Sequence, residues 1–259
     1  MRFVNFSLLA ALIVAWIPAT GQAQELVELA KTLQASVVVL EVDAALGEPR
    51  STGTGFFVTR GGEIVTNYHV IQGAQSISAR THEDVRIAID SVLAIDEEND
   101  LALLLAEPGD YIPLRLARSS TVETGSRVVV LGNPLGLDFT LSEGIISAVR
   151  GAQERRESGP KVPHLQISAP ISFGSSGSPV MTLSGDVVGV VVSGFVDAQN
   201  LNFAIPVSAL KELQELAAQN PDGVALPSPW IKTGINLGIS FVFFGMVVWF
   251  FRRMSPRRA

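Results

Sequence analysis

Short apolar runs separated by turn-forming residues are the feature that most restricts how this chain folds. Between Ser36 and Ser193 the sequence alternates between runs rich in Val, Ile and Leu and breaks made of Gly, Pro, Asn, Asp or Ser. The runs are 36–42, 55–59, 63–67, 76–80, 85–95, 101–106, 127–132, 141–149, 164–168, 178–182 and 187–193. Many short strands with turns between them and little helical periodicity are typical of an antiparallel all-β sandwich or barrel.

Two segments of the body have helical character instead. Residues 24–32 predict a short helix, and 209–219 predict a longer one, with Ser208 as its cap and apolar residues recurring on one face. Asn220-Pro221-Asp222-Gly223 ends that second helix. We expect the polar stretch 150–160 to form a mobile loop.

Composition excludes several classes of function. The 259 residues are enough for one large or two small domains. The absence of cysteine rules out a disulfide framework, a thiolate metal site, an iron–sulfur cluster and a cysteine nucleophile, and we predict no cofactor. A net charge of -6 argues against nucleic acid as a partner. A mean hydropathy of +0.34 is high for a chain with 17% charged residues, so apolar residues must be concentrated in places.

The first apolar concentration lies at the N-terminus. Met1-Arg2 precede an apolar stretch over 7–17, which small residues follow up to Ala23. This order predicts a secretory signal peptide over 1–23, cleaved after Ala23 or, alternatively, after Gly21. The apolar stretch is shorter than the roughly 20 residues that a spanning helix needs. An uncleaved signal anchor is the competing interpretation.

The second concentration lies at the C-terminus. Residues 234–251 carry no charge, and an arginine-rich tail follows them. We predict a transmembrane helix over 231–251 and, by the positive-inside rule, a cytoplasmic tail over 252–259. A buried core helix is the alternative, but such a helix does not usually end in four arginines. With a Pro-rich linker over 220–230, the pattern describes a single-pass type I protein of a bacterial inner membrane, with its body over 24–219 in the periplasm.

The charge is unevenly divided between the body and the ends. Arg2, Lys232 and the four C-terminal arginines hold six of the 19 basic residues, whereas all 25 acidic residues lie from Glu25 to Asp222. The predicted exported part, which is the body together with the linker, is therefore left with 13 basic and 25 acidic side chains, a net charge of -12.

One set of residues could perform nucleophilic catalysis. His69, Asp100 and Ser176 each stand at an edge of an apolar run or in a glycine-rich loop. A serine hydroxyl needs an imidazole to take its proton, and the imidazole needs a carboxylate to orient it. An α/β-hydrolase requires its histidine after the serine, yet no histidine follows His164. A subtilisin order that uses Asp43 suits an all-β chain poorly, whereas His, Asp, Ser is the chymotrypsin order.

Five motifs then resemble HtrA/Deg-type trypsin-like proteases. The segments are Thr-Asn-Tyr-His-Val-Ile at 66–71, Asp-Leu-Ala-Leu-Leu at 100–104, Leu-Gly-Asn-Pro-Leu-Gly at 131–136, Ser-Glu-Gly-Ile-Ile-Ser at 142–147 and Phe-Ala-Ile-Pro at 203–206. They occur in the family's order over roughly residues 30–219. The resemblance implies a chymotrypsin-like double six-stranded β-barrel with a C-terminal helix.

The resemblance also implies roles for individual residues. Ser176 would be the nucleophile, His69 the general base and then acid, and Asp100 the orienting carboxylate. The backbone N–H groups of Gly174 and Ser176 would form the oxyanion hole.

The sequence departs from the family around the nucleophile. Ser175 replaces the usual asparagine, and Gly177-Ser178 replace a pair of glycines. Val192 stands where relatives often carry a hydroxyl near the catalytic carboxylate, so Asp100 is expected to be less well hydrogen-bonded.

The expected substrate pocket also differs from that of trypsin. Pro170 takes the place of the acidic pocket floor, six residues before the nucleophile. Ile171, Val192, Ser193 and Gly194 are the expected wall. We therefore predict a preference for small or medium apolar side chains over Arg or Lys.

Two functions from different classes fit these observations. The first is a membrane-anchored, exported serine endopeptidase that cleaves unfolded proteins or a partner near the membrane, in quality control or regulated proteolysis. The rival is a catalytically weak scaffold that uses the protease fold to bind a membrane or periplasmic partner. The expected partners are protein or peptide substrates and, through the C-terminal span, the lipid bilayer. The segment after the second helix is too short for a PDZ domain, and a trimer stays open.

The remaining histidines have simpler interpretations. We expect His82 to lie in a polar hairpin turn rather than to bind a metal. His164 is interpreted as structural or as a weak pH sensor.

Overall fold

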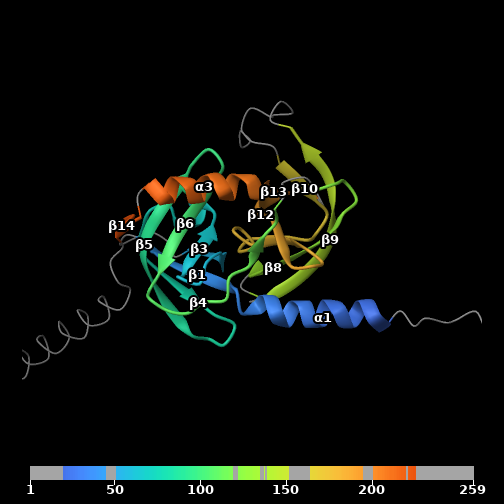
Figure 1. The fold of residues 1–259 in the computed structure, drawn as a ribbon, viewed down its shortest axis with the longest axis horizontal. Helices are drawn as coiled ribbons and strands as arrows, with labels where there is room; N and C mark the ends of the chain where they lie inside the picture. Colours follow the sequence, from blue (N-terminus) through green and yellow to red (C-terminus); the bar gives the residue numbers. More distant parts are fainter. Residues whose placement is uncertain are drawn as a thin grey trace, which may run out of the picture.

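The body folds into two antiparallel β-barrels, which lie side by side (Figure 1). The computed structural model describes residues 20–44, 51–118, 122–134, 137, 139–151, 164–194, 201–219 and 221–225. The helices are α1 (Thr20–Gln34), α2 (Tyr68–Ile71) and α3 (Val207–Gln219). The strands are β1 (Val37–Ala44), β2 (Ser51–Phe57), β3 (Glu63–Thr66), β4 (Ala74–Arg80), β5 (Arg86–Asp96), β6 (Leu101–Ala106), β7 (Arg115–Leu116), β8 (Arg127–Gly132), β9 (Thr140–Arg150), β10 (His164–Ile167), β11 (Pro179–Thr182), β12 (Asp186–Gly194), β13 (Asn202–Pro206) and β14 (Val224–Ala225).

The first barrel is formed by β1 to β6. Its strands follow the order β4-β1-β2-β3-β6-β5, and pairing of β5 with β4 and with β6 closes the ring. Side chains such as Leu40, Ile64 and Leu104 point inward and are fully buried. Because successive side chains of a strand point to opposite faces, one face of each strand can fill the barrel.

The second barrel repeats this arrangement with the other half of the body. The strands follow the order β11-β8-β9-β10-β13-β12, and β11 pairs with β12 to close it. Val128, Ile146 and Leu165 belong to its core. The all-β double six-stranded barrel of the chymotrypsin type is thereby confirmed.

A third apolar cluster joins the two barrels. It contains Phe56 and Leu103 from the first barrel and Met181 and Val190 from the second, all fully buried. Helix α3 also contributes, and it lies across both barrels in Figure 1. The C-terminal helix expected over 209–219 is thus confirmed, and it begins two residues earlier.

Several boundaries differ from the sequence prediction. β2 begins at Ser51, four residues before the predicted run 55–59, because its first residues pair with the end of β1. The 203–206 motif forms β13, which the run pattern did not identify as a strand. Helix α1 extends from Thr20 across the predicted cleavage point after Ala23. Within the predicted linker, Val224 and Ala225 pair with β5 as β14.

The predicted terminal segments lie mainly beyond the described residues. These are most of the signal peptide, the transmembrane segment 231–251 and the tail 252–259, together with nearly all of the expected loop 150–160. None of the three described helices is both long and apolar enough to cross a bilayer.

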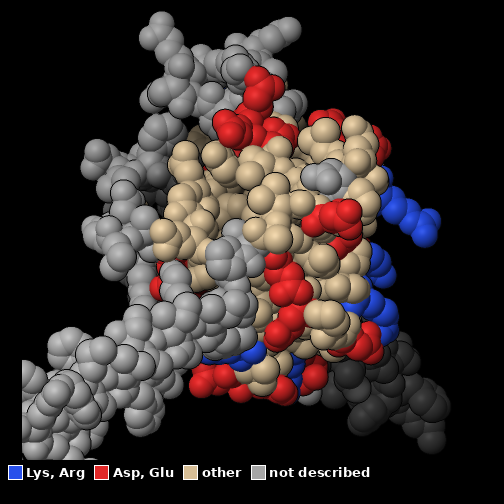
Figure 2. All heavy atoms as spheres, turned by 90° about the vertical axis from the view of Figure 1, so that its left-hand side faces the viewer, with Lys and Arg blue, Asp and Glu red and all other residues tan. Residues whose placement is uncertain are grey.

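The acidic character of the body is visible on its surface. Figure 2 shows Asp and Glu side chains spread over the face at the β5 and β14 end of the molecule. Asp90 on β5, Glu97 in the following turn, and Glu212 and Glu215 on α3 are all exposed. Such a surface favours basic or neutral partners over polyanions.

Candidate active site

The pairing of β3 with β6 brings His69 and Asp100 together. The two strands are antiparallel, so the residues that follow β3 pass beside the residue that precedes β6. The Tyr68 N–H donates to the Asp100 carbonyl at 3.1 Å, and the Asn67 side-chain amide donates to the same oxygen at 2.9 Å. His69, on the single turn of α2, is thereby held next to the Asp100 side chain.

Both carboxylate oxygens of Asp100 contact His69. Oδ2 lies 2.6 Å from the imidazole Nδ1, and Oδ1 accepts the His69 backbone N–H at 2.8 Å. Asp100 has a φ of 53°, a conformation that aspartate tolerates better than most residues. The acceptor at Nδ1 favours the tautomer protonated there, which leaves Nε2 able to accept a proton.

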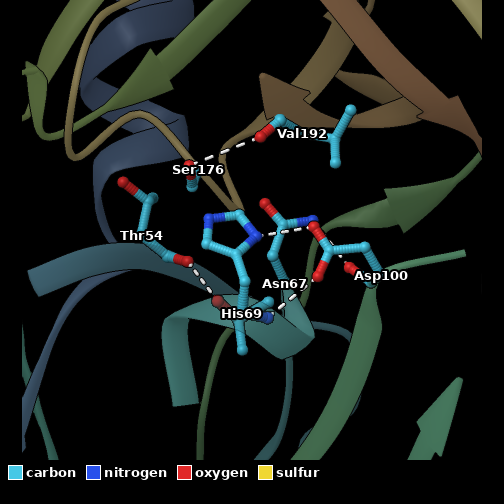
Figure 3. Close-up of polar contacts among 7 residues, drawn as sticks. Thr54, Asn67, His69, Asp100, Ser176 and Val192 are labelled. Carbon is cyan, nitrogen blue, oxygen red and sulfur yellow. Dashed lines mark hydrogen bonds and ion pairs between the residues drawn. The ribbon is translucent and has the colours of Figure 1, made fainter. Parts of the chain in front are cut away.

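Ser176 lies on the opposite side of the imidazole from Asp100 (Figure 3). It belongs to the loop between β10 and β11, so the second barrel supplies it while the first supplies the other two residues. Its hydroxyl donates to the carbonyl of Val192 at 3.5 Å, which is long for a hydrogen bond. Within the described part of the chain it makes no hydrogen bond to His69. Such contacts are often loose without substrate and tighten when it binds.

The loop that carries Ser176 has unused backbone donors on both sides of Ser175. The Ser175 N–H donates to the carbonyl of Ser172, and the Ser178 N–H donates to the carbonyl of Ser175, each at 3.0 Å. By contrast, the N–H groups of Gly174 and Ser176 have no acceptor among the described residues. Gly174 has a φ of 92°, which a side chain would disfavour. Two free amides beside a hydroxyl can bind a developing negative charge.

The serine that replaces asparagine at position 175 has a structural task. Ser175 is only 3% exposed, and its hydroxyl accepts the Ser172 N–H at 3.2 Å. Together with the backbone bond between the same two residues, this contact closes a small ring in the loop. With serine instead of asparagine at position 175, the loop is therefore still held by a side-chain hydrogen bond.

Ser175→Ala is expected to lower the free energy of unfolding by about 1–2 kcal/mol, because the Ser172 N–H loses its partner in a part-buried place. Urea unfolding measures the change. Ser147→Ala is the matched control, since the Ser147 hydroxyl has no hydrogen bond among the described residues, and it should shift stability by less than about 0.5 kcal/mol. Equal effects of the two variants would refute this role for Ser175.

The residues expected to form the pocket are placed around the same loop. Pro170 is exposed, and its carbonyl accepts the Ser142 hydroxyl at 3.0 Å. Ile171 packs against the core of the second barrel. The side chain of Val192 is 6% exposed and belongs to the cluster between the barrels. The group of Val192 that contacts Ser176 is its backbone carbonyl. Ser193 and Gly194 are the last residues of β12, and the side chain of Ser193 is not among the described parts of the structure.

The other two histidines have aromatic neighbours. His82 lies in the turn between β4 and β5, as expected, with its ring edge-on to Phe139 at 6.1 Å. His164 begins β10 and is edge-on to Phe203 at 6.2 Å. In the residues that the structure describes, no group of three or more His, Asp or Glu side chains is placed to hold a metal ion.

Sequence reasoning missed Thr54, whose contacts reach the Ser176 loop. Its hydroxyl donates to the Gly174 carbonyl at 2.8 Å, although the two residues lie 120 positions apart. The only local sign is that Thr54 stands between two glycines, Gly53 and Gly55, where the backbone approaches other chain segments closely.

Comparison with known families agrees with this geometry. The family profile of the trypsin-like peptidase domain matches residues 53–190, just over half of the chain. The matched segment includes His69, Asp100 and Ser176.

Individual relatives point the same way. The "Probable periplasmic serine endoprotease DegP-like" of Hahella chejuensis is 35% identical over 187 residues, which are 71% of this chain and 38% of that protein. The solved structure "HtrA-type protease AlgW with tripeptide" superposes with a TM-score of 0.65 at 27% identity, over 73% of this chain and 62% of the other. The Rv3671c protease of M. tuberculosis, in its active form, gives 0.66 at 25% identity, over 84% and 94%.

The similarity is confined to one part of the longer relatives. The chain spans less than half of the length of the curated proteins that it matches first. In that shared part, the two barrels, the loop that carries Ser176 and the family profile all indicate the same family. The chain belongs to the trypsin-like peptidase family, and its body is an HtrA/Deg-like serine protease domain.

Proposed function

We propose that this chain is a serine endopeptidase that cleaves peptide bonds through an acyl-enzyme. Ser176 attacks the scissile carbonyl carbon while His69 Nε2 takes the hydroxyl proton. His69 then gives that proton to the leaving amine, and water releases the acyl group from Ser176 in the second half of the reaction. Asp100 holds the imidazole in the required tautomer and stabilises its charged form.

The observation that carries the proposal is the pair of contacts between Asp100 and His69, at 2.6 Å and 2.8 Å, with Ser176 across the ring. A carboxylate that only stabilised the fold would not need to bind both the backbone and the ring of one histidine. The free N–H groups of Gly174 and Ser176 add the donors that a tetrahedral oxyanion requires.

Labelling with a fluorophosphonate probe tests the proposal. The probe forms a bond from the serine oxygen to phosphorus and expels fluoride, so it reports an activated serine. We expect the purified full-length chain to be labelled at neutral pH and Ser176→Ala to remain unlabelled, with Ser147→Ala labelled as the wild type is. Absence of labelling in folded wild-type protein would refute the proposal and favour the alternative, a catalytically weak scaffold that binds a partner.

We propose that the enzyme prefers small or medium apolar side chains at the cleaved position and acts in quality control or regulated proteolysis. Support comes from Pro170, which places no acid where a basic substrate side chain would need one. Ile171, which is partly buried in the same loop, adds apolar surface there. Peptide libraries cleaved by the protein would reveal the preference directly.

We also propose that the protein is exported and anchored in the inner membrane by residues 231–251, with the tail 252–259 in the cytoplasm. The sequence supports this through its uncharged run and arginine-rich end, and one similar protein is named periplasmic. The acidic body would be repelled by an anionic bilayer, so the linker residues after β14, 226–230, set its distance from the lipid. A reporter fused after Ala259 should be active only on the cytoplasmic side, and activity on the exported side would contradict this orientation.

A further inference from the structure

Thr54 joins the first barrel to the loop of the second barrel that carries Ser176. It lies on β2 and is completely buried. Its hydroxyl donates to the Gly174 carbonyl at 2.8 Å, and its N–H donates to the Ser176 carbonyl at 2.9 Å. One residue therefore holds the loop on both sides of Ser175.

The hydroxyl of Thr54 is itself fixed in direction. It accepts the Asn133 N–H at 3.1 Å, so its own proton is directed to the Gly174 carbonyl. The carbonyl of Thr54 accepts the Thr66 hydroxyl at 2.7 Å, which fixes the strand behind it. Figure 3 shows Thr54 above α2 and on the same side of His69 as Ser176.

The loop lies directly against Thr54. A Cβ atom built on Gly177 would lie 2.0 Å from the Thr54 carbonyl oxygen, closer than any real contact. Gly177 has a φ of 84°, so both its conformation and its surroundings require glycine. The loop consequently has little room to shift relative to the strand.

These contacts bear on the two free amides. In a trans peptide the C=O and N–H point in opposite directions, so holding a carbonyl also directs the amide of that unit. The Ser175 carbonyl, held by the Ser178 N–H, directs the Ser176 N–H away from the loop interior. Thr54 holds the carbonyls of the two neighbouring peptide units, Gly174–Ser175 and Ser176–Gly177, and thereby fixes the backbone on both sides of this unit. The Gly174 N–H belongs to the preceding unit, so Thr54 acts on it through the backbone of Gly174.

We propose that Thr54 is a positioning residue for acyl transfer, whose hydroxyl holds the Gly174 and Ser176 amides where the oxyanion develops. This inference rests on the proposed peptidase function. Thr54 touches no reacting atom and acts through the loop. Because oxyanion donors act mainly in the transition state, its loss lowers kcat more than it raises KM.

The test compares Thr54→Val, which removes the hydroxyl at equal size, with Thr54→Ser, which keeps it. Turnover of a peptide substrate is expressed per active site, counted by complete fluorophosphonate labelling of the full-length chain. We expect Thr54→Val to lower kcat about 10- to 100-fold with KM within about twofold, given that losing one oxyanion donor outright costs about 100- to 1000-fold. Thr54→Ser should stay within about threefold of the wild type.

A second measurement separates positioning from folding. A peptide aldehyde adds to Ser176 to form a tetrahedral hemiacetal, and its inhibition constant should weaken by the same factor as kcat/KM in Thr54→Val. Thr66→Val, which removes only the bond to the Thr54 carbonyl, should lower kcat in the same direction by a smaller factor. Thr81→Val is the control, because it loses only the Val85 contact in the turn between β4 and β5 and should leave kcat unchanged.

The outcomes distinguish this inference from the peptidase proposal. Wild-type kcat per labelled site in both Thr54→Val and Thr66→Val would overturn the positioning role while the peptidase proposal stands. Equal losses in Thr54→Ser and Thr54→Val would also overturn it. If Thr54→Val does not fold, wild-type kcat in Thr66→Val decides against the role and a lowered value decides for it. An unlabelled wild type would instead overturn the peptidase proposal itself.

Discussion

His69→Ala is expected to lower kcat for peptide hydrolysis by about a million-fold, the largest effect of any single change that we predict. Without the imidazole, nothing accepts the Ser176 proton, and the hydroxyl is a very weak nucleophile at neutral pH. KM should change little, because His69 acts in the chemical step rather than in substrate binding. Steady-state kinetics with a chromogenic peptide measure both quantities.

His82→Ala is the matched control for this prediction. It also removes one histidine, but its ring faces Phe139 in the turn between β4 and β5. We expect its kcat to equal that of the wild type. A loss of less than about a hundredfold in folded His69→Ala would show that His69 is not the general base.

Asp100→Asn should lower kcat about 10,000-fold at neutral pH. An asparagine can still accept the His69 N–H with its oxygen and tolerates the positive φ found there. Its NH₂ group, however, donates to Nδ1 and so favours the tautomer with the proton on Nε2. That nitrogen can then no longer take the proton of Ser176.

The thermal stability of Asp100→Asn should stay close to that of the wild type, because size and backbone conformation are preserved. Asp110→Asn provides the comparison, since among the described residues Asp110 pairs only with the exposed Arg60, at 3.0 Å. We expect Asp110→Asn to keep full activity. Equal kcat values in the two variants would contradict the orienting role of Asp100.

The local signals of the sequence predicted much of the barrel fold. The run 101–106 became β6 with its predicted ends, and 127–132 became β8 in the same way. Both strands are rich in Val or Leu and are buried over nearly all of their length, so the pattern of apolar residues is enough to identify them. The turn residues around them carry the rest of the signal.

Some elements were not predictable from such signals. β13 has Asn202 and Pro206 at its ends, residues that usually mark turns, and its strand character comes from pairing with β10 and β12. β14 consists of two exposed residues that pair with β5, in a segment for which the sequence predicts a linker. Tertiary pairing decided both cases against local preference.

The same distinction between local sequence signals and tertiary contacts applies to the candidate active site. Local sequence was enough to select His69, Asp100 and Ser176, because each chemical group stands in a short motif of its own. The departure at Ser175 could be seen in the sequence, but its consequence could not, since the bond to the Ser172 N–H depends on the path of the loop. Likewise, Val192 contributes its carbonyl rather than its side chain.

The sequence by itself determined most of the barrel strands, which three residues could do the chemistry and how acidic the body is, because these follow from residue type and short-range spacing. Only the tertiary structure decided that Thr54 of the first barrel holds Gly174 and Ser176 of the second. That contact joins positions 120 residues apart, and its existence depends on how two closed barrels pack on their shared core. Short-range patterns carry no information about which buried hydroxyl faces which distant carbonyl.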